Sequence, residues 1–250
     1  MLNESQFFKE LEHLNDYLDN ILDNRLMAGF SYSIPKELFT TFVIAKSRKT
    51  HEAITLLCKN GFGEDAFMLS RTLFELLIIF LYILKDTKNR LARYIKYDHV
   101  TREKLYNYIS TKPEFLRDER ATPEVIQQIH DAYKEVKDDY EKPFTWSDKT
   151  IGEMSKEVGR FEAYKTVYKL QCILSHSEPR SINDYFKEEN ELLVIDVGAK
   201  TNLIDKSLIV NFDFFFAILE EVNEVFKLGL EEKFKEISTR FVDLINNQKN

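Results

Sequence analysis

The sequence has few of the residues that make tight turns or cross-links. Its 250 residues include only seven glycines, five prolines and two cysteines, Cys58 and Cys172. Scarce turn residues, together with abundant Leu, Lys and Glu, favour long helices. Two cysteines are too few for a disulfide framework or a thiolate metal site, and each lies in an apolar helical segment, where a reduced buried thiol is expected. We therefore expect a mostly α-helical bundle that holds no cofactor and no metal.

Targeting signals and phosphate-binding loops are also missing. Residues 1–10, MLNESQFFKE, have neither a basic region nor an apolar run, which predicts no export signal and a cytoplasmic location. The nearest glycine-rich segment, Asn60 to Gly63, lacks the lysine of the motif and the preceding strand, so it does not fit a phosphate-binding loop. The net charge of −7 argues against a broad nucleic-acid surface, although a local basic groove is compatible with that total.

One apolar stretch stands out, residues 67–84, FMLSRTLFELLIIFLYIL. It is apolar on nearly every face of a helix, as in the centre of a bundle or in a membrane span. Only residues 76–84 are free of polar groups, which is about half of the roughly 20 residues that a span requires. We therefore expect the central helix of a soluble bundle and no membrane association.

Arg71 and Glu75 lie within this stretch, four residues apart and on one stripe of the helix. Burying either charge without a partner would cost several kcal/mol. The two side chains are therefore expected to satisfy each other and a third group that comes from another helix.

Apolar repeats and capping residues predict the other elements. Thr150 and Glu153 have the spacing of a capping box, which starts a helix. Residues 191–197, ELLVIDV, are the one strand-like segment, either half of a small β-hairpin with residues 203–210 or an extended connection. Helices are expected over residues 4–24, 35–60, 87–110, 122–140, 150–158, 161–176 and 207–246, the last with a break at Gly229.

We find no internal repeat, no low-complexity tract and no linker, so residues 1–250 are expected to form a single helical domain with its core at about 35–190. The helices of residues 200–250 would pack on that core or form an oligomer seam. Apolar residues there follow a four-three spacing, which fits either an internal contact or a homo-oligomer interface. These residues are Leu208, Phe212, Phe215, Leu219, Val222 and Phe226.

The second informative stretch is the helix expected at residues 161–176. Tyr164, Tyr168, Cys172 and His176 are spaced by four and share one face of a regular helix. Ser175 lies beside them, and Arg180 follows shortly after. Cys172 and His176 could share a metal ion, but no third or fourth ligand is indicated.

In these stretches the chain resembles a family of bacterial all-helical proteins of unassigned function. That family pairs a hydrophobic helix bearing Arg-x-x-x-Glu with a later Tyr-rich helix that ends in Ser-His and is followed by a Tyr. The resemblance covers roughly residues 35–190 and implies a bundle in which Arg71, Glu75 and His176 converge, but no activity. The matching residues are Arg71, Glu75, Arg93, Tyr94, Tyr97, Trp146, Tyr164, Tyr168, Ser175, His176 and Tyr185.

The chain is more loosely similar to HEPN-type helical bundles, many of which are ribonucleases or noncatalytic nucleotide-binding or toxin-partner modules. Their active site contains an Arg, which holds phosphate, and a His, which acts as general base. Four to six residues separate the Arg from the His in the sequence, and the site is paired across a dimer. Arg93 and His99 are separated by five residues and fit this spacing, although Tyr94 stands where such proteins usually have a polar residue. The resemblance implies an effector of bacterial stress or phage defence that acts on RNA or a nucleotide.

Two interpretations of the polar residues remain open at this point. Arg71, Glu75 and His176 would form either a structural ion-pair network or a ligand site, with Arg71 as the anion anchor and His176 as a proton donor or acceptor. The function is accordingly an effector that acts on RNA or a nucleotide, or a noncatalytic module that binds a ligand or a protein. Candidate ligand-binding residues are Tyr168, Ser175, Arg180 and Tyr185.

Overall fold

The computed structural model describes residues 6–21, 35–112, 122–141, 145–189, 192–195, 198–199 and 202–247. The chain forms two compact units, unit 1 (Met1–Leu81 and Val158–Asn250) and unit 2 (Tyr82–Glu157). One boundary lies within a long helix and the other at the end of a short one, so no linker composition marks them. The single domain expected from the sequence stays a prediction.

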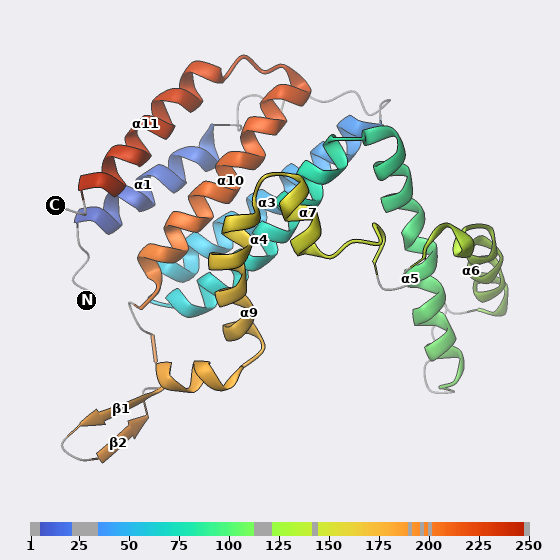
Figure 1. The fold of residues 1–250 in the computed structure, drawn as a ribbon, viewed down its shortest axis with the longest axis horizontal. Coiled ribbons are helices and arrows are strands. Elements are labelled where there is room, and N and C mark those ends of the chain that lie inside the picture. The colour runs from blue at the N-terminus through green and yellow to red at the C-terminus, as the bar shows by residue number, and fades with distance from the viewer. Residues whose placement is uncertain are drawn as a thin grey trace. The chain divides into compact units, whose positions relative to one another are not determined.

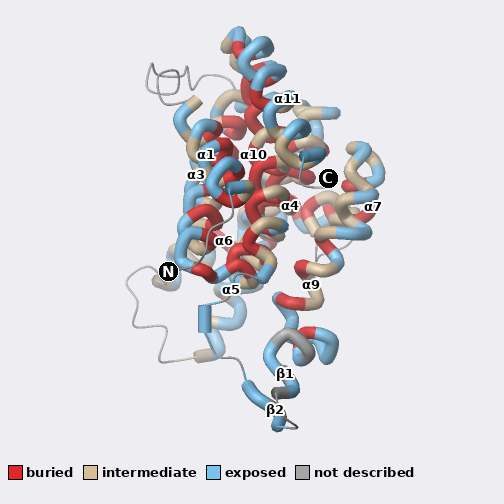
Figure 2. The backbone as a smooth tube through the Cα atoms, turned by 90° about the vertical axis from the view of Figure 1, so that its left-hand side faces the viewer, coloured by how far each residue is buried: buried red, intermediate tan, exposed pale blue. Residues whose placement is uncertain are grey.

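Unit 1 is a helical bundle, with α10 packed against α1 and α3, and α11 against α1 (Figure 1). Buried residues run along α4 and α10, which are the two most apolar helices (Figure 2). Its elements are α1 (Gln6–Asn20), α3 (Pro35–Lys59), α4 (Gly63–Leu84, continuing into unit 2), α8 (Phe161–Ala163), η4 (Tyr164–Tyr168), α9 (Lys169–Ser175), η5 (Pro179–Asp184), β1 (Phe186–Glu189), β2 (Leu192–Ile195), α10 (Ile204–Phe226) and α11 (Glu231–Asn247).

The predicted central helix is confirmed as α4. Large side chains connect it to its neighbours: the Phe74 ring lies 5.1 Å from that of Phe214, and the Phe80 ring 6.1 Å from that of Phe39. Each such buried ring contributes about 1.5–3 kcal/mol of hydrophobic stabilisation. Length and apolar composition alone would let α4 span a membrane, but 56% of its most apolar window is buried inside the fold, as in the core helix of a globular protein.

The four-three seam of α10 is an internal contact in this structure. Phe212 stacks on Phe241 of α11 with ring centroids 4.0 Å apart, and α1 and α3 cover other parts of the helix. Five of the six seam residues are buried within the chain and Phe226 is half-buried. A homo-oligomer through these residues remains a proposal, and it would require α10 to be uncovered.

The small hairpin is present, but its expected pairing is wrong. β1 and β2 are antiparallel, with Phe186 paired to Ile195, whereas residues 203–210 belong to the start of α10. The apolar residues of that segment belong to the four-three seam of α10. A helix buries these side chains in the core, whereas a strand would not. β1 has the sequence FKEE, whose charges give no alternating strand pattern.

Unit 2 is smaller and is built around α5 and α6. A core of Val100, Val136 and Tyr140 lies between them, with Tyr97 and Tyr133 packed against it. One side of α6 is therefore buried on α5. The elements are η1 (Thr87–Leu91), α5 (Ala92–Ser110), α6 (Pro123–Val136), η3 (Lys137–Asp139) and α7 (Ile151–Glu157).

The capping box at the start of α7 is confirmed and gives a first prediction. The Glu153 backbone N–H donates to Thr150 Oγ1 at 3.2 Å, and the Thr150 backbone N–H donates to Glu153 Oε2 at 2.7 Å. We expect Thr150→Ala to lower the free energy of unfolding of unit 2 by about 1 kcal/mol, measured by urea denaturation. Thr101→Ala, on the exposed face of α5, is the matched control, and an equal effect of both changes would contradict the role of the cap.

Candidate functional site

Arg71 of α4 is the centre of a polar cluster in unit 1. Its Nε donates to Glu75 Oε1 at 3.0 Å, its Nη1 lies 3.1 Å from His176 Nε2, and its Nη2 donates to Tyr168 Oη at 3.4 Å. The Tyr168 hydroxyl in turn donates to Glu75 Oε1 at 2.8 Å. The structure thus brings together the three residues that the sequence placed in one group, and Tyr168 closes the network.

The cluster is open to solvent rather than sealed in the core. The side chains of Arg71 and Glu75 are 24% and 34% exposed, and His176, at the end of α9, is exposed. A guanidinium can only donate hydrogen bonds, so His176 Nε2 must accept one and carries a lone pair. The Nε2 lone pair therefore faces Arg71, at a position that is accessible to a ligand.

Tyr168 connects this cluster to the hydrophobic core. Its ring is buried and lies 5.3 Å from that of Phe74, which packs on Phe214. Burial, and then the hydrogen bond to the Glu75 carboxylate, raise the pKa of Tyr168 well above its usual range. The hydroxyl therefore stays protonated and holds both Glu75 and Arg71 in place.

A π-helical turn lies in the middle of the helix that carries Tyr168. Within α8, η4 and α9, the backbone N–H of Lys169 bonds to the carbonyl of Tyr164, five residues back. Such turns are rare and often occur at functional sites. The sequence did not reveal it, because side-chain spacing by four describes a regular helix and carries no sign of an extra residue.

Gln171 is a second contact that the sequence analysis missed. It is fully buried and its Nε2 donates to Ser70 Oγ of α4 at 2.6 Å. The Ser175 hydroxyl donates to the Gln171 carbonyl at 2.7 Å, within its own helix. Ser175 is thus not part of the Arg71 cluster, while Gln171 fixes α9 to α4 behind it.

Arg180 and Tyr185 lie elsewhere on unit 1. The Tyr185 hydroxyl donates to Glu64 Oε1 at 2.7 Å. Arg180 and Glu64 line a pocket of about 390 Å³ whose walls include Leu174. Leu174 and His176 are two residues apart on the helix and point in nearly opposite directions, so these two candidates belong to a different face from the Arg71 cluster.

Arg93 and His99, the other candidate pair, belong to unit 2. Arg93 donates from Nε to the Trp146 carbonyl at 2.7 Å and from Nη1 to the Asp139 carbonyl, and its Nη2 pairs with Asp148. An offset of six positions along the helix turns the two side chains about a third of a turn apart, so they do not converge within one chain. Arg93 holds unit 2 together in this structure, and the pairing across a dimer stays a prediction.

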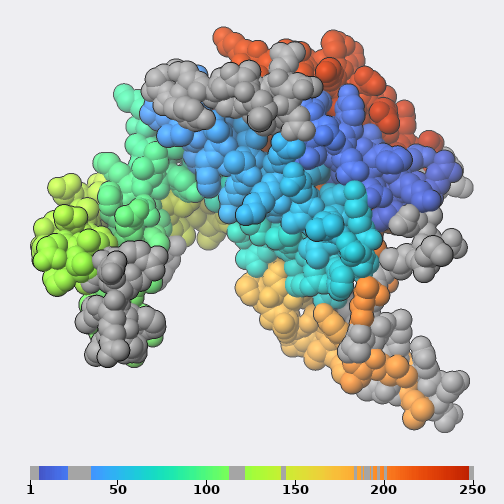
Figure 3. All heavy atoms as spheres, turned by 180° about the vertical axis from the view of Figure 1, so that it is seen from behind, coloured from blue at the N-terminus to red at the C-terminus, as the bar shows by residue number. Residues whose placement is uncertain are grey.

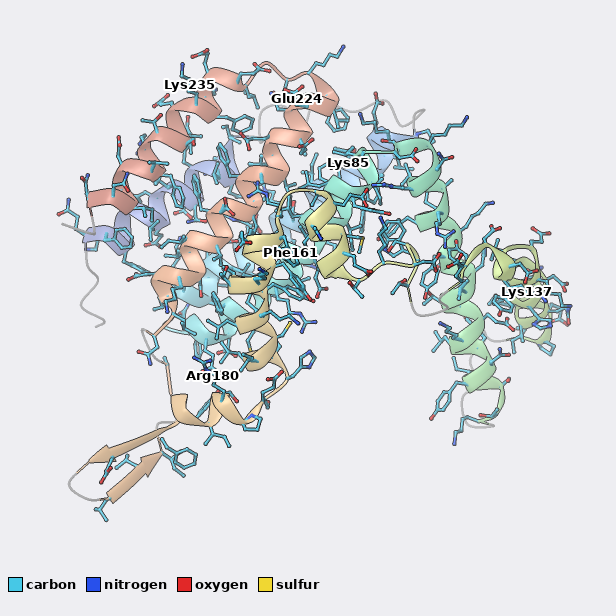
Figure 4. All side chains as sticks on the ribbon, viewed as in Figure 1. Lys85, Lys137, Phe161, Arg180, Glu224 and Lys235 are labelled. Carbon is cyan, nitrogen blue, oxygen red and sulfur yellow. The ribbon has the colours of Figure 1, made fainter. Side chains whose placement is uncertain are left out.

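Cations lie over a row of aromatic rings next to the Arg71 cluster. The rings of Phe161 and Tyr164 are stacked with centroids 5.9 Å apart, and those of Tyr164 and Tyr168 with centroids 5.2 Å apart. Lys165 Nζ lies 5.0 Å from the centroid of Phe161, Lys169 Nζ 5.2 Å from that of Tyr164, and Arg71 Cζ 5.2 Å from that of Tyr168. Figure 4 labels Phe161, where this row begins.

The structure shows no candidate metal site among the residues that it describes. Across the residues whose placement is described, no group of three or more His, Cys, Asp or Glu side chains could hold a metal ion. Cys172 is a free, half-buried thiol beside the cluster. The cluster itself presents a guanidinium, a carboxylate, a phenol and an imidazole.

Tyr168→Phe tests whether the hydroxyl stabilises the cluster. Removal of the hydroxyl takes a donor from the Glu75 carboxylate, and bonds to charged groups contribute about 1.5–3 kcal/mol. We expect the free energy of unfolding of unit 1 to fall by about 1.5 kcal/mol in urea denaturation. The control is Tyr164→Phe, which keeps the ring stack and loses a hydroxyl that no described residue bonds. Equal stability of the two variants would contradict the role of Tyr168.

A family model described as a family of unknown function, DUF5677, matches residues 38–192. This range contains Arg71, Glu75, Tyr168 and His176, and it nearly coincides with the range of the resemblance found in the sequence. No curated protein and no solved structure matches the chain. Because the matched range covers more than half of its length, the chain belongs to DUF5677, a family of unknown function.

Proposed function

We propose that the chain binds single-stranded RNA along α8, η4 and α9 and cleaves it at the Arg71 cluster. The observation that carries the proposal is the 3.1 Å contact between Arg71 Nη1 and His176 Nε2 at a solvent-accessible position. It places an anion anchor beside a proton acceptor, which are two groups that can promote phosphodiester cleavage.

The row of cations supports binding of a polyanion. The whole chain is acidic, but Lys165 and Lys169 are exposed and lie over the first two rings of the row whose third ring, Tyr168, carries Arg71. Single strands bind where positive charge follows the backbone and aromatic faces stack on the bases. The half-buried rings of Phe161 and Tyr164 supply such faces once the lysines move onto phosphates.

The proposed reaction uses His176 as the general base. When a phosphate binds, Arg71 Nη1 donates to a phosphate oxygen instead of to His176 Nε2. The released Nε2 takes the proton of the ribose 2′-hydroxyl, and the 2′-oxygen attacks phosphorus. The bond to the 5′-oxygen breaks, and that oxygen takes a proton from water. The hydroxide left behind takes the proton from His176, which restores the imidazole for the next cycle. Glu75 and Tyr168 act as positioning residues, since both hold Arg71.

The similarity to HEPN-type bundles extends the proposal to a role as an effector of bacterial stress or phage defence. Expression in growing bacteria tests this role. Growth arrest by the wild-type chain, and normal growth with His176→Ala at equal protein level, is the expected result. Normal growth in both cultures would contradict it.

A noncatalytic module is the second candidate, and one observation favours it. All three guanidinium nitrogens of Arg71 already contact protein groups, as in a structural network. In that case the cluster would hold α9 on α4, and the surface around it would bind a ligand or a protein without changing it.

Incubation of the purified chain with end-labelled RNA in EDTA separates the two candidates. Cleavage of single-stranded RNA, and none of single-stranded DNA, supports the nuclease, while binding without cleavage supports the noncatalytic module. We expect the double variant Lys165→Ala/Lys169→Ala to weaken RNA binding. The number of ions released on binding, given by the slope of the logarithm of the binding constant against that of the salt concentration, should fall by about two. Lys233→Ala/Lys235→Ala, on exposed positions of α11, is the matched control. Absence of any RNA binding would contradict the proposal.

A further inference from the structure

A pocket of about 390 Å³ lies in unit 1 where α9, η5 and the starts of α4 and α10 meet. In Figure 3 the first turns of α4 (cyan) lie against the chain of α9 and η5 (orange). None of the described residues that line the pocket belongs to the Arg71 cluster. Its volume is at the lower end of small-molecule pockets, so it fits a small ligand and not a polymer.

Contacts between distant segments hold the walls of this pocket. The Tyr185 hydroxyl donates to Glu64 Oε1 at 2.7 Å, which joins the end of η5 to the start of α4. The Ser207 hydroxyl donates to the Gly63 carbonyl at 2.8 Å, which joins α10 to α4. Gln171 fixes α9 to α4 from a fully buried position. The pocket is therefore formed before a ligand arrives, which lowers the entropic cost of binding.

Two cations line the pocket from different elements. They are Arg180 of η5, which Figure 4 labels, and Lys206 in the first turn of α10. Both side chains are exposed, and neither has a hydrogen bond or an ion pair with any residue that the structure describes. Arginines on α3, α4, η1 and α5, by contrast, each pair with a carboxylate. Arg180 and Lys206 are thus available to a ligand.

The balance of charge at the pocket is positive. Glu64 is the one carboxylate among the described residues that line it, and this side chain already accepts from Tyr185. Two cations against one carboxylate leave one positive charge. A guanidinium binds a carboxylate through two parallel N–H donors, which adds specificity to the attraction. The pocket therefore favours a ligand with a single negative charge.

Leucine side chains form the apolar part of the wall. Leu170 and Leu174 are four residues apart on α9 and share one face of that helix. Leu203 comes from the residue before α10. Leu174 is buried and the other two are half-buried, so a ligand that covers them removes apolar surface from water. An anionic group on a short alkyl chain satisfies both parts of the wall, whereas inorganic phosphate satisfies only one.

We propose that this pocket binds a small aliphatic carboxylate. Arg180 donates to both carboxylate oxygens, Lys206 supplies the second positive charge, and the alkyl chain lies on the three leucines. The site shares no residue with the proposed RNA site, so it does not depend on that proposal.

Calorimetric titration of the whole chain with hexanoate tests the proposal. The controls are 1-hexanol, which has the same length and no charge, hexylamine, which has the opposite charge, and inorganic phosphate, which has no alkyl chain. Saturable binding of one hexanoate, and of none of the controls, is the expected result. Butanoate, which is two methylene groups shorter, should bind about tenfold more weakly.

Variants at the two cations test their roles. Arg180→Gln should weaken binding of hexanoate about tenfold, because it removes a charged donor that bonds both oxygens. Lys206→Gln should weaken it about threefold. Arg240→Gln on α11 is the matched control and should leave the affinity unchanged. All three side chains are exposed and have no partner among the described residues, so none of the changes threatens folding.

Leucine methyl resonances locate the bound ligand. In a chain with labelled leucine methyl groups, the signals of Leu170, Leu174 and Leu203 should shift with hexanoate, while that of Leu11, buried in α1, should not. Absence of saturation, equal binding of hexanol and hexanoate, or binding that leaves these three signals unchanged would each overturn the proposal. Equal affinities of Arg180→Gln and Arg240→Gln would overturn it as well. Binding of phosphate in place of hexanoate would do the same and would indicate a phosphate site.

Discussion

Replacement of His176 by alanine is expected to lower the rate of RNA cleavage by about 10²–10⁴-fold. The imidazole lies beside the phosphate anchor, whereas the Glu75 carboxylate already accepts from Arg71 and Tyr168, and Tyr168 keeps its proton. His176 is exposed, so its removal should change the free energy of unfolding by less than about 0.5 kcal/mol. Initial rates with labelled RNA, together with urea denaturation, measure both quantities.

His99→Ala is the matched control, since it removes the histidine of the other candidate pair. We expect this variant to cleave RNA at the wild-type rate, because Arg93 donates to acceptors within unit 2. Loss of cleavage in His99→Ala with full activity in His176→Ala would move the site to unit 2. Unchanged rates in both variants would exclude both histidines as the general base.

Gly63→Ala is expected to destabilise unit 1 by about 3 kcal/mol, at the upper end of the cost of overpacking. Gly63 begins α4 where its backbone meets the start of α10, and the Ser207 hydroxyl donates to the Gly63 carbonyl at 2.8 Å. A Cβ at this position would lie 2.7 Å from the backbone nitrogen of Ile204 and closer still to the carbonyl oxygen of Asn202. Backbone atoms cannot rotate away as a side chain can, so the two helices would have to separate.

Urea denaturation of Gly63→Ala and Gly198→Ala measures this effect. A Cβ at Gly198 meets no atom within 4 Å, so this control should stay within about 0.5 kcal/mol of the wild type. Equal stability of the two variants would show that α4 and α10 do not approach each other as closely as in this structure.

The helices and the central site could be predicted because both depend on local patterns in the sequence. An all-round apolar helix has to be buried, and its Arg71 and Glu75 have to be partnered, so α4 and a third polar residue could be anticipated. The resemblance supplied His176 as that residue. Tyr168 was named as a ligand-binding candidate, and the structure adds that it anchors Arg71 from the core.

Other features depend on contacts between distant segments or on backbone detail that patterns do not record. The pairing of β1 with β2 was not predicted because β1 is rich in charge. The sequence analysis instead considered the start of α10 as the partner of the segment that contains β2. The π-helical turn of η4 contains one residue more than a regular α-helical turn. The spacing of side chains in the sequence does not show this extra residue. The boundary between the two units after Leu81 lies inside α4, where no change in composition marks it.

The identity of the product ends tests the central claim most directly. A single-stranded RNA and the same RNA methylated at every 2′-oxygen are incubated with the chain in EDTA, and the fragments are weighed by mass spectrometry. Attack by the 2′-oxygen, with His176 as base, predicts fragments that end in a 2′,3′-cyclic phosphate and a 5′-hydroxyl, and no fragments from the methylated RNA. Cleavage of the methylated RNA, or fragments with 5′-phosphate ends, would contradict the mechanism.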